Sequence, residues 1–203
     1  MSDPVSALHG ASFTGFSTIR EIGPQGMITL RAAPDTPGLE AAIRHCTQTE
    51  IPKQCQVVHN AGRAAGWMSP DEYLLILPYD QTDAALAGIA QHMSGAHHLA
   101  VSVSDARAVF RVEGAQADQV LAKLVPVDLA NFPEGELRRT RAAQVAVAFW
   151  RDGDGMTLVC FRSVARYVFD LLASSAKPGS ELTSFATDAG PGRVRGGESS
   201  QYR

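Results

Sequence analysis

The hydrophobic positions of this chain recur with two periods, one typical of strands and one typical of helices. Between residues 108 and 113 the sequence AVFRVE is rich in β-branched and aromatic residues and stops at Gly114, which predicts a short strand. From residue 115 to 124 the apolar side chains are three and four positions apart, which predicts an amphipathic helix that ends before Pro126. A strand followed by a helix is therefore expected here.

The next block has the pattern of a hairpin followed by a helix. Two β-prone runs, VAVAFW from Val145 and MTLVCF from Met156, flank an Asp/Gly turn at residues 152–155. Ser163 stands where a helix N-cap is expected, and the apolar residues after it follow helical spacing: Val164, Tyr167, Val168, Leu171 and Leu172. The block from residue 108 to 172 thus predicts the order strand, helix, hairpin, helix.

The first half of the chain shows a looser copy of this order. Its pattern predicts a helix that starts at Thr36–Gly38, a second helix capped by Asp80 that runs to about Met93, and strands at 27–31, 56–59, 62–67 and 73–77. Residues 98–103 (HLAVSV) predict a strand that joins the two halves.

A constant offset of 83 residues relates the two copies. It connects Trp67 to Trp150, Tyr73 to Met156, Leu75 to Leu158, Leu77 to Cys160, and the predicted cap Asp80 to the predicted cap Ser163. Because the strands come in hairpins rather than alternating with every helix, the sheets should be antiparallel. We therefore predict an α+β fold that is two-layer and internally duplicated, with antiparallel sheets and helices on one face.

The pattern also predicts how the chain is divided. Residues 1–25 are expected to form an extended N-terminal arm, and residues 26–176 the duplicated domain, with halves at about 26–97 and 98–176. Residues 177–203 are dominated by Gly, Ser and Pro and predict a flexible C-terminal tail, in which only Phe185 and Tyr202 could anchor a partner.

Composition and charge exclude several classes of partner. The 203 residues carry a formal net charge of −3, and no segment concentrates Lys or Arg with aromatic residues, so no nucleic-acid partner is expected. No run approaches the length of a membrane-spanning helix and no secretory leader is recognisable, so no membrane partner is expected either. Three cysteines, an odd number, are typical of a reducing compartment, and we expect a cytoplasmic protein.

The motifs that hold nucleotides and metals are missing from the pattern. There is no G-x-G-x-x-G after a strand and no Walker loop, and Asp152 and Asp154 would repel phosphate from the Gly153 turn. The possible metal ligands His45, Cys46, Cys55 and His59 do not reproduce the spacing of zinc motifs. His97–His98 has no nucleophile context, and burial in a strand would leave Cys160 unreactive. No catalytic, cofactor-binding or metal residues are therefore predicted.

Two groups of charged residues leave an alternative open. Asp105 with Arg107, and Arg162 with Arg166 one turn further on, could line a pocket for a carboxylate, although exposed ion pairs are the commoner outcome. Trp67 and Trp150 each end a strand and are expected in the core or at an interface. A domain that binds folate or another pterin between its halves, through Asp105 or Arg166, is the alternative function, and a freestanding interaction module is a third.

Several segments together resemble one known family. They are GMITLRA, GWMSPDEYLLILP, VSDARAVFRVEGAQADQVLAKLVPVDL, FPEGE and CFRSVARYVFDLL, which lie between Gly26 and Leu172. Taken together, they resemble the gamma subunit of heterotetrameric sarcosine oxidase, a family similar in fold to the folate-binding aminomethyltransferase of glycine cleavage. The aminomethyltransferase motif G-Y-T-G-E is absent at Gly66–Glu72, and the K-G-C-Y-x-G-Q-E motif of the iron–sulfur repair relatives is absent as well.

The resemblance implies a non-catalytic subunit of an oxidoreductase complex. The partners it implies are the alpha, beta and delta subunits, of which alpha and beta carry FAD, FMN, NAD and the tetrahydrofolate site and delta binds zinc. It implies no cofactor in this chain and a role in assembly. A subunit should expose an apolar patch larger than is usual for a monomer, and the N-terminal arm is the expected part of it.

Overall fold

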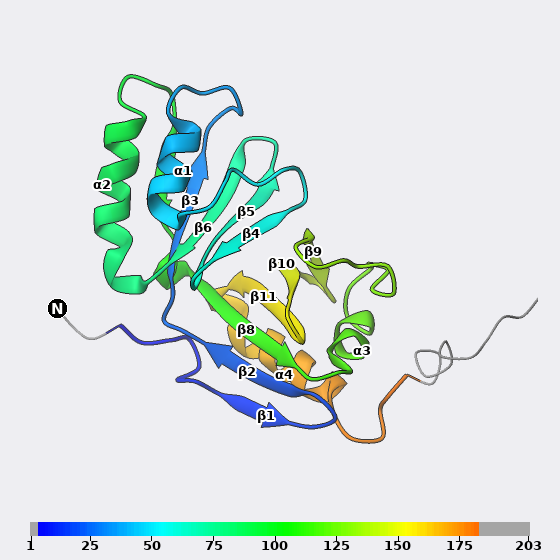
Figure 1. Cartoon of the computed structure of the whole chain (residues 1–203). Helices are drawn as coiled ribbons and strands as arrows, with labels where there is room; N and C mark the ends of the chain where they lie inside the picture. Colours follow the sequence, from blue (N-terminus) through cyan, green and yellow to red (C-terminus); the bar gives the residue numbers. More distant parts are fainter. Residues whose placement is uncertain (1–3, 183–203) are drawn as a thin grey trace, which may run out of the picture.

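The computed structural model describes residues 4–182 and contains two antiparallel sheets. The first sheet has five strands in the order β4-β5-β6-β3-β7, and α1 and α2 lie side by side against one face of it (Figure 1). The bounds of these elements are β3 (Gly26–Arg31), α1 (Leu39–Thr47), β4 (Val57–Asn60), β5 (Arg63–Ser69), β6 (Glu72–Leu77), α2 (Thr82–His92) and β7 (Leu99–Ser102).

The second sheet has six strands in the order β1-β2-β8-β11-β10-β9, with α3 and α4 packed against one face. Its elements are β1 (Ser12–Thr14), β2 (Thr18–Ile22), β8 (Arg107–Glu113), α3 (Ala117–Ala122), β9 (Leu137–Ala142), β10 (Val145–Asp152), β11 (Gly155–Phe161) and α4 (Ala165–Ser175). The predicted hairpin, and the strand and helix before it, are confirmed by β10, β11, β8 and α3.

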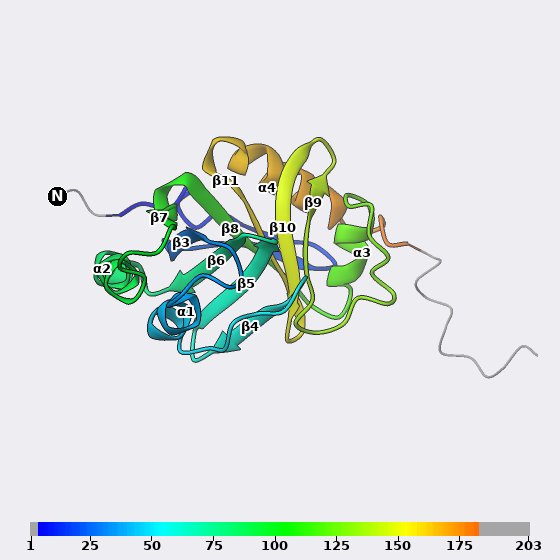
Figure 2. The same cartoon turned by 90° about the horizontal axis from the view of Figure 1, so that it is seen from above.

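Successive side chains along each strand point to opposite faces of its sheet, and apolar residues are buried on both faces of both sheets. In β6, Tyr73, Leu75 and Leu77 pack toward α1 and α2, whereas Leu74 and Ile76 join a cluster that also contains Val109, Trp150 and Val159 of the second sheet. The helix-free faces of the two sheets therefore pack against each other, with helices on the outside (Figure 2). The predicted fold class is confirmed: each half has two layers, with helices on one face of an antiparallel sheet.

The two halves follow one plan, element by element. An offset of 83 residues carries the start of the short 3₁₀ turn at Tyr79 to the one at Arg162, and the start of α2 at Thr82 to the start of α4 at Ala165. The predicted caps were wrong, because Asp80 and Ser163 lie inside these 3₁₀ turns and make no capping hydrogen bond. The turn starts one or two positions beyond the last residue of the hairpin and moves the helix start two residues beyond the expected cap.

The strand that leads into each half pairs with the sheet of the other half. β2 precedes the first half but pairs with β8, and β7 precedes the second half but pairs with β3. Residues 12–22, expected as part of a separate arm, are therefore two strands of the second sheet, and the predicted joining strand belongs to the first sheet. Ile19 of β2 is fully buried against α4, so hydrophobic burial outweighs the Gly- and Ser-rich composition around it.

The beginning of the C-terminal segment is held against α3. The Lys123 ammonium donates hydrogen bonds to the Ser175 carbonyl (2.6 Å) and to Ser180 Oγ (3.1 Å), and the backbone N–H of Leu182 donates to Gln119 Oε1 (2.7 Å). Residues 177–182, expected as the start of a flexible tail, are thus held by hydrogen bonds to α3 and to the residue that follows it. The proposed anchors Phe185 and Tyr202 lie outside the described residues. Between residues 4 and 182, no helix has the length and apolar character needed to cross a bilayer.

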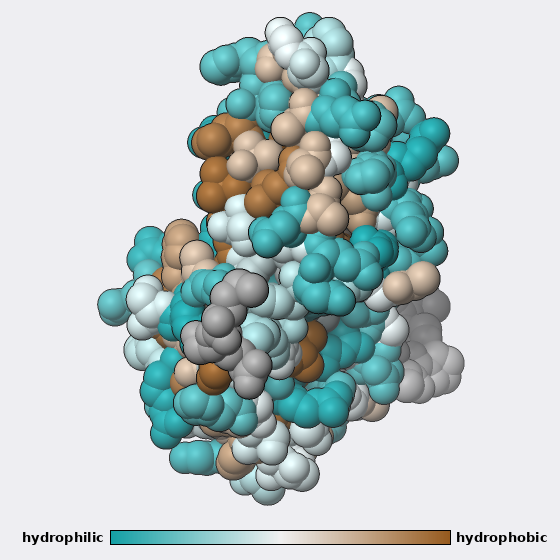
Figure 3. All heavy atoms as spheres, turned by 90° about the vertical axis from the view of Figure 1, so that its left-hand side faces the viewer, coloured by the Kyte–Doolittle hydropathy of each residue, from teal (hydrophilic) through white to brown (hydrophobic). Residues whose placement is uncertain are grey.

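Exposed apolar side chains gather away from the N-terminal segment. Leu99 and Val101 of β7 are 55% and 44% exposed, and they lie at the open edge of the first sheet. Figure 3 shows a hydrophobic area at the left of the upper half of the molecule, on the side where β7 lies. The N-terminal arm was expected to form part of such a surface. Its Val5 is exposed, but most of its other apolar residues pack on the core of the second half.

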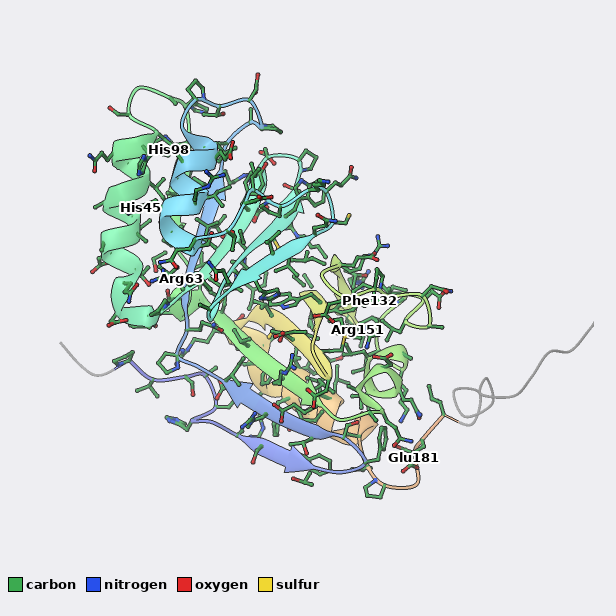
Figure 4. All side chains as sticks on the ribbon, in the orientation of Figure 1. His45, Arg63, His98, Phe132, Arg151 and Glu181 are labelled. Atoms are coloured by element: carbon green, nitrogen blue, oxygen red, sulfur yellow. The ribbon has the colours of Figure 1, made fainter. Side chains whose placement is uncertain are left out.

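Arg151 on β10 forms hydrogen bonds that hold the long segment between α3 and β9 against the second sheet (Figure 4). Its guanidinium donates to the Phe132 carbonyl (3.0 Å) and to Asp118 Oδ2 (2.9 Å), at a site where both charges are mostly buried. We expect Arg151→Ala to lower the free energy of unfolding by about 1–2 kcal/mol. Urea titration would measure this. Arg166→Ala is the matched control: its ion pair with Asp170 is exposed, so its loss should change stability by less than about 0.5 kcal/mol.

Candidate functional site

A small pocket lies where the two sheets face each other at one end of their interface. The first sheet supplies Thr29, Met68, Glu72 and Leu74, and the second supplies residues of β8, β9, β10 and β11, among them Arg107, Arg139, Ala148, Val159 and Phe161. These residues converge because alternation places them on the helix-free faces of both sheets. The pocket therefore joins the two halves of the repeat.

Two arginines give this pocket its charge, and only one of them has an acidic partner. Arg139 pairs with Glu72 across the two sheets at 3.1 Å. The Arg107 guanidinium lies over the ring of Phe161, 4.1 Å from its centroid, and makes no side-chain hydrogen bond or ion pair within residues 4–182. Burial lowers the pKa of Arg107; Glu72 acts in the opposite direction and Arg139 in the same one. An arginine side chain remains protonated at neutral pH, so Arg107 is a partly buried cation that has no ion pair of its own, since Glu72 is paired with Arg139.

The size of the pocket limits what it can hold. Its volume is about 40 Å³, enough for a few waters or for one small charged group, whereas small-molecule sites usually measure about 300–1,000 Å³. The walls are mostly apolar, and no serine, cysteine or histidine lines them. The arrangement is suited to receiving a carboxylate on Arg107. Thr29 is the hydroxyl residue of the lining, and its side chain is not hydrogen-bonded to Glu72, which pairs with Arg139.

Asp105 and Arg162, which were also singled out in the sequence, line a second pocket of about 10 Å³ that shares Arg107 with the first. Asp105 accepts a hydrogen bond from the Tyr79 hydroxyl (3.1 Å) and does not face Arg107 as an ion pair. Arg162 lies in the 3₁₀ turn before α4 and donates to the Ser6 carbonyl (3.2 Å), and Arg166 pairs with Asp170 on the surface of α4. The structure thus brings Asp105, Arg107 and Arg162 together, but around a space with room for about one water, and Arg166 lines neither pocket.

Cysteine and histidine side chains are spread over different layers. Cys46 of α1 is buried and donates to the Ala85 carbonyl, whereas His45 beside it is exposed and lies near His92 of α2 (Figure 4). His59 lies on the other side of the sheet near Trp150, and His98 bonds to the Ala96 carbonyl. In the described part of the chain, no three potential ligands come together in a way that could hold a metal ion.

Thiol reactivity offers a check on this arrangement. Burial raises the pKa of Cys46 to about 11 and that of Cys160 to about 12, whereas Cys55 is partly exposed before β4. We expect a thiol reagent such as Ellman's reagent to modify one cysteine per folded chain at pH 8, and all three after unfolding. The variant Cys55→Ser should then show no fast-reacting thiol. Fast modification of a second cysteine in the folded chain would contradict the burial described here.

The fold is a duplicated α+β domain of the kind found in aminomethyltransferases. The glycine cleavage aminomethyltransferase T from Bartonella henselae superimposes with a TM-score of 0.59 over 85% of this chain and 49% of that chain, at 14% identity. At that identity the likeness concerns the fold alone.

The family itself is shown by the sequence comparison. The model of the sarcosine oxidase, gamma subunit family matches residues 31–177, and the chain belongs to this family. Sarcosine oxidase subunit gamma from an Arthrobacter species is 32% identical over 153 residues, which is 73% of both chains, and that of Corynebacterium strain P-1 is 32% identical over 152 residues. A chain of the heterotetrameric sarcosine oxidase from Corynebacterium U-96 superimposes with a TM-score of 0.72 at 26% identity, covering 81% of this chain and 87% of that one.

Proposed function

We propose that this chain is the non-catalytic gamma subunit of a heterotetrameric sarcosine oxidase and that its role is in assembly. The observation that carries the proposal, beside the family, is the space between the two halves. Trp150, Val159 and Leu74 fill it, and the remaining pocket of about 40 Å³ is too small for a cofactor. In this proposal the chain contributes a rigid domain and binding surfaces to the complex and takes no part in the reaction.

In this proposal the active site lies in partner subunits. The complex would convert sarcosine, tetrahydrofolate and O2 into glycine, 5,10-methylenetetrahydrofolate and H2O2. FAD, FMN and NAD would be held by the alpha and beta subunits and zinc by the delta subunit. We place the complex in the cytoplasm, because all three cysteines of the chain are unpaired.

Expression of the chain alone and together with its three partners tests this function. The isolated chain should show no flavin absorbance and no sarcosine-dependent peroxide, whereas the co-expressed set should purify as one complex with both. Flavin or activity in the isolated chain would overturn the proposal. A stable chain that never associates with the alpha, beta or delta subunits would instead support a freestanding module.

The alternative, a folate- or pterin-binding domain that acts on its own, fits the residues poorly. A bicyclic pterin is far larger than the pocket, and of the two residues expected to hold it, neither Asp105 nor Arg166 lines the walls. Equilibrium dialysis of the isolated chain against tetrahydrofolate should detect no binding at about 1 mM, a limit that corresponds to only about −4 kcal/mol. Saturable binding below that concentration would favour the alternative.

A further inference from the structure

The second sheet leaves one end of the first sheet uncovered. A row of cross-strand neighbours on the helix-free face runs from Leu74 of β6 through Thr29 of β3 to Val101 of β7. Leu74 is only 3% exposed, Thr29 is half-buried at the pocket, and Val101 is exposed, as is Leu99 two residues earlier. The apolar face therefore continues from the core through the pocket to the open surface seen in Figure 3.

The repeat shows that this exposed apolar end is not needed for folding. Strand pairing places Val101 beside Thr29, and in the other half it places Arg20 beside Arg111 at the equivalent position. By the same register Leu99 corresponds to Thr18. Arg20 and Arg111 are both paired with Glu113, so the second half has a polar, ion-paired surface at this position. The fold accepts polar residues there, and the apolar residues on β7 call for a separate explanation.

The strand itself has an unpaired edge. β7 is the last strand of its sheet and pairs with β3 only, so the backbone groups on its outer side have no strand partner within residues 4–182. Exposed edges with apolar side chains are the surfaces to which an extended peptide adds a further strand. Its main-chain hydrogen bonds would supply affinity, and its side chains would lie beside Leu99 and Val101.

The pocket next to this edge carries positive charge and therefore favours a partner segment with an acidic side chain. Thr29 borders both Val101 and the pocket that contains Arg107 and Phe161, and Phe161 is 47% exposed. Arg107 has no ion pair of its own, its neighbour Arg139 adds positive charge, and Glu72 is already paired with Arg139. Room for one small group beside a partly buried guanidinium is complementary to a single carboxylate.

We propose that Leu99, Val101, Thr29, Arg107 and Phe161 form one docking surface, here named the β7 surface. Its occupant is an extended segment of a partner subunit that adds a strand beside β7, packs apolar side chains on Leu99 and Val101, and places one Asp or Glu carboxylate against Arg107. This inference rests on the proposed function, because it requires that the chain work inside a complex.

Capture of partner subunits by tagged variants tests the proposal. In co-expression with the alpha, beta and delta subunits, Val101→Asp and Arg107→Gln should each weaken association by about tenfold or more, the loss expected for an interface hot spot. Tyr167→Asp and Arg166→Gln on α4 are matched controls, since Tyr167 is 43% exposed and the Arg166 side chain is exposed as well, and both should assemble normally. Circular dichroism would confirm that all four variants are folded.

A photo-crosslinking amino acid at position 101 identifies the occupant. In the assembled complex it should join one partner peptide that contains an Asp or Glu among apolar residues. Undiminished capture by Val101→Asp and Arg107→Gln would overturn the β7 surface and leave the subunit proposal standing. A crosslink to a second copy of this chain, or none to a partner, would overturn it as well. Failure of the unmodified chain to capture any partner would overturn the subunit proposal and this inference together.

Discussion

A chain that lacks residues 1–22 is expected not to fold. Its β8, now a central strand, would become an edge, and the fully buried Ile19 would be lost from the core beneath α4. The backbone pairing of β2 with β8 runs over five residue pairs and would disappear as well. Together these losses exceed about 5 kcal/mol, the lower end of the total stability of ordinary domains.

Circular dichroism and size-exclusion chromatography would measure this result: the truncated chain should aggregate or lose its cooperative thermal transition. Ile19→Asp should reproduce most of the effect in the full-length chain, because it buries a charge without a partner. Val5→Asp is the control, since Val5 is 46% exposed and its replacement should change stability by less than about 0.5 kcal/mol. A truncated chain with an unchanged melting temperature would show that the N-terminal strands are dispensable.

Phe110→Ala is expected to lower the free energy of unfolding by about 3–5 kcal/mol. Phe110 lies in the middle of β8, is fully buried, and packs against Phe169 of α4 with ring centroids 6.1 Å apart. Its truncation would leave a cavity between the sheet and the helix layer of the second half, where neighbouring strands prevent collapse. Urea unfolding monitored by tryptophan fluorescence would measure the loss.

Replacement of Phe161 by alanine is expected to weaken the binding of partner subunits with little effect on the stability of the chain. Phe161 is about half exposed at the end of β11, so Phe161→Ala should cost less than about 1 kcal/mol. It should nevertheless weaken capture of partner subunits, because its ring belongs to the β7 surface. If Phe110→Ala and Phe161→Ala lowered the free energy of unfolding equally, Phe110 would not be central to the core between the second sheet and its helices.

The duplicated fold could be predicted because its strongest signals are local. Both hairpins and the helices after them keep a constant spacing, so the pairs Trp67 and Trp150, and Leu75 and Leu158, stay in step along the chain. Turn residues and helical apolar stripes act over short distances, and the sequence contains them directly. The helix starts were misplaced because a 3₁₀ turn has no distinct side-chain signature.

The strands β1, β2 and β9 were not predicted, and the structure shows the reason for β9 and β2. β9 (LRRTRA) carries three arginines because it is an edge strand whose side chains reach solvent and acidic partners such as Glu72. β2 contains Glu21, which is buried although glutamate is usually found on the surface, so the sequence did not indicate a buried strand. Its carboxylate is satisfied by hydrogen bonds from the backbone N–H groups of Leu8 and Gly10 and from the Ser6 hydroxyl, and all three lie in the preceding segment.

The pocket was predicted only in part, because its residues meet through strand pairing between the halves. Arg107 was noticed, but it was grouped with the neighbouring Asp105, which turns toward Tyr79 instead. The pairing of Glu72 with Arg139 joins residues 67 positions apart and has no local pattern. Its only hint is the alternation of arginines along β9, which places Arg139 on the same face as the buried Leu137.

The exchange of leading strands between the halves also sets the order in which the protein can be completed during synthesis. The first sheet is finished as soon as β7 leaves the ribosome, because the strands it needs have already been made. β2, in contrast, is made before either half but can pair with β8 only after the whole first half and β7 have been made. The nascent chain therefore carries β2 as an unpaired, partly apolar strand while the whole first half is synthesised, and during that time this strand is open to misassociation or chaperone binding.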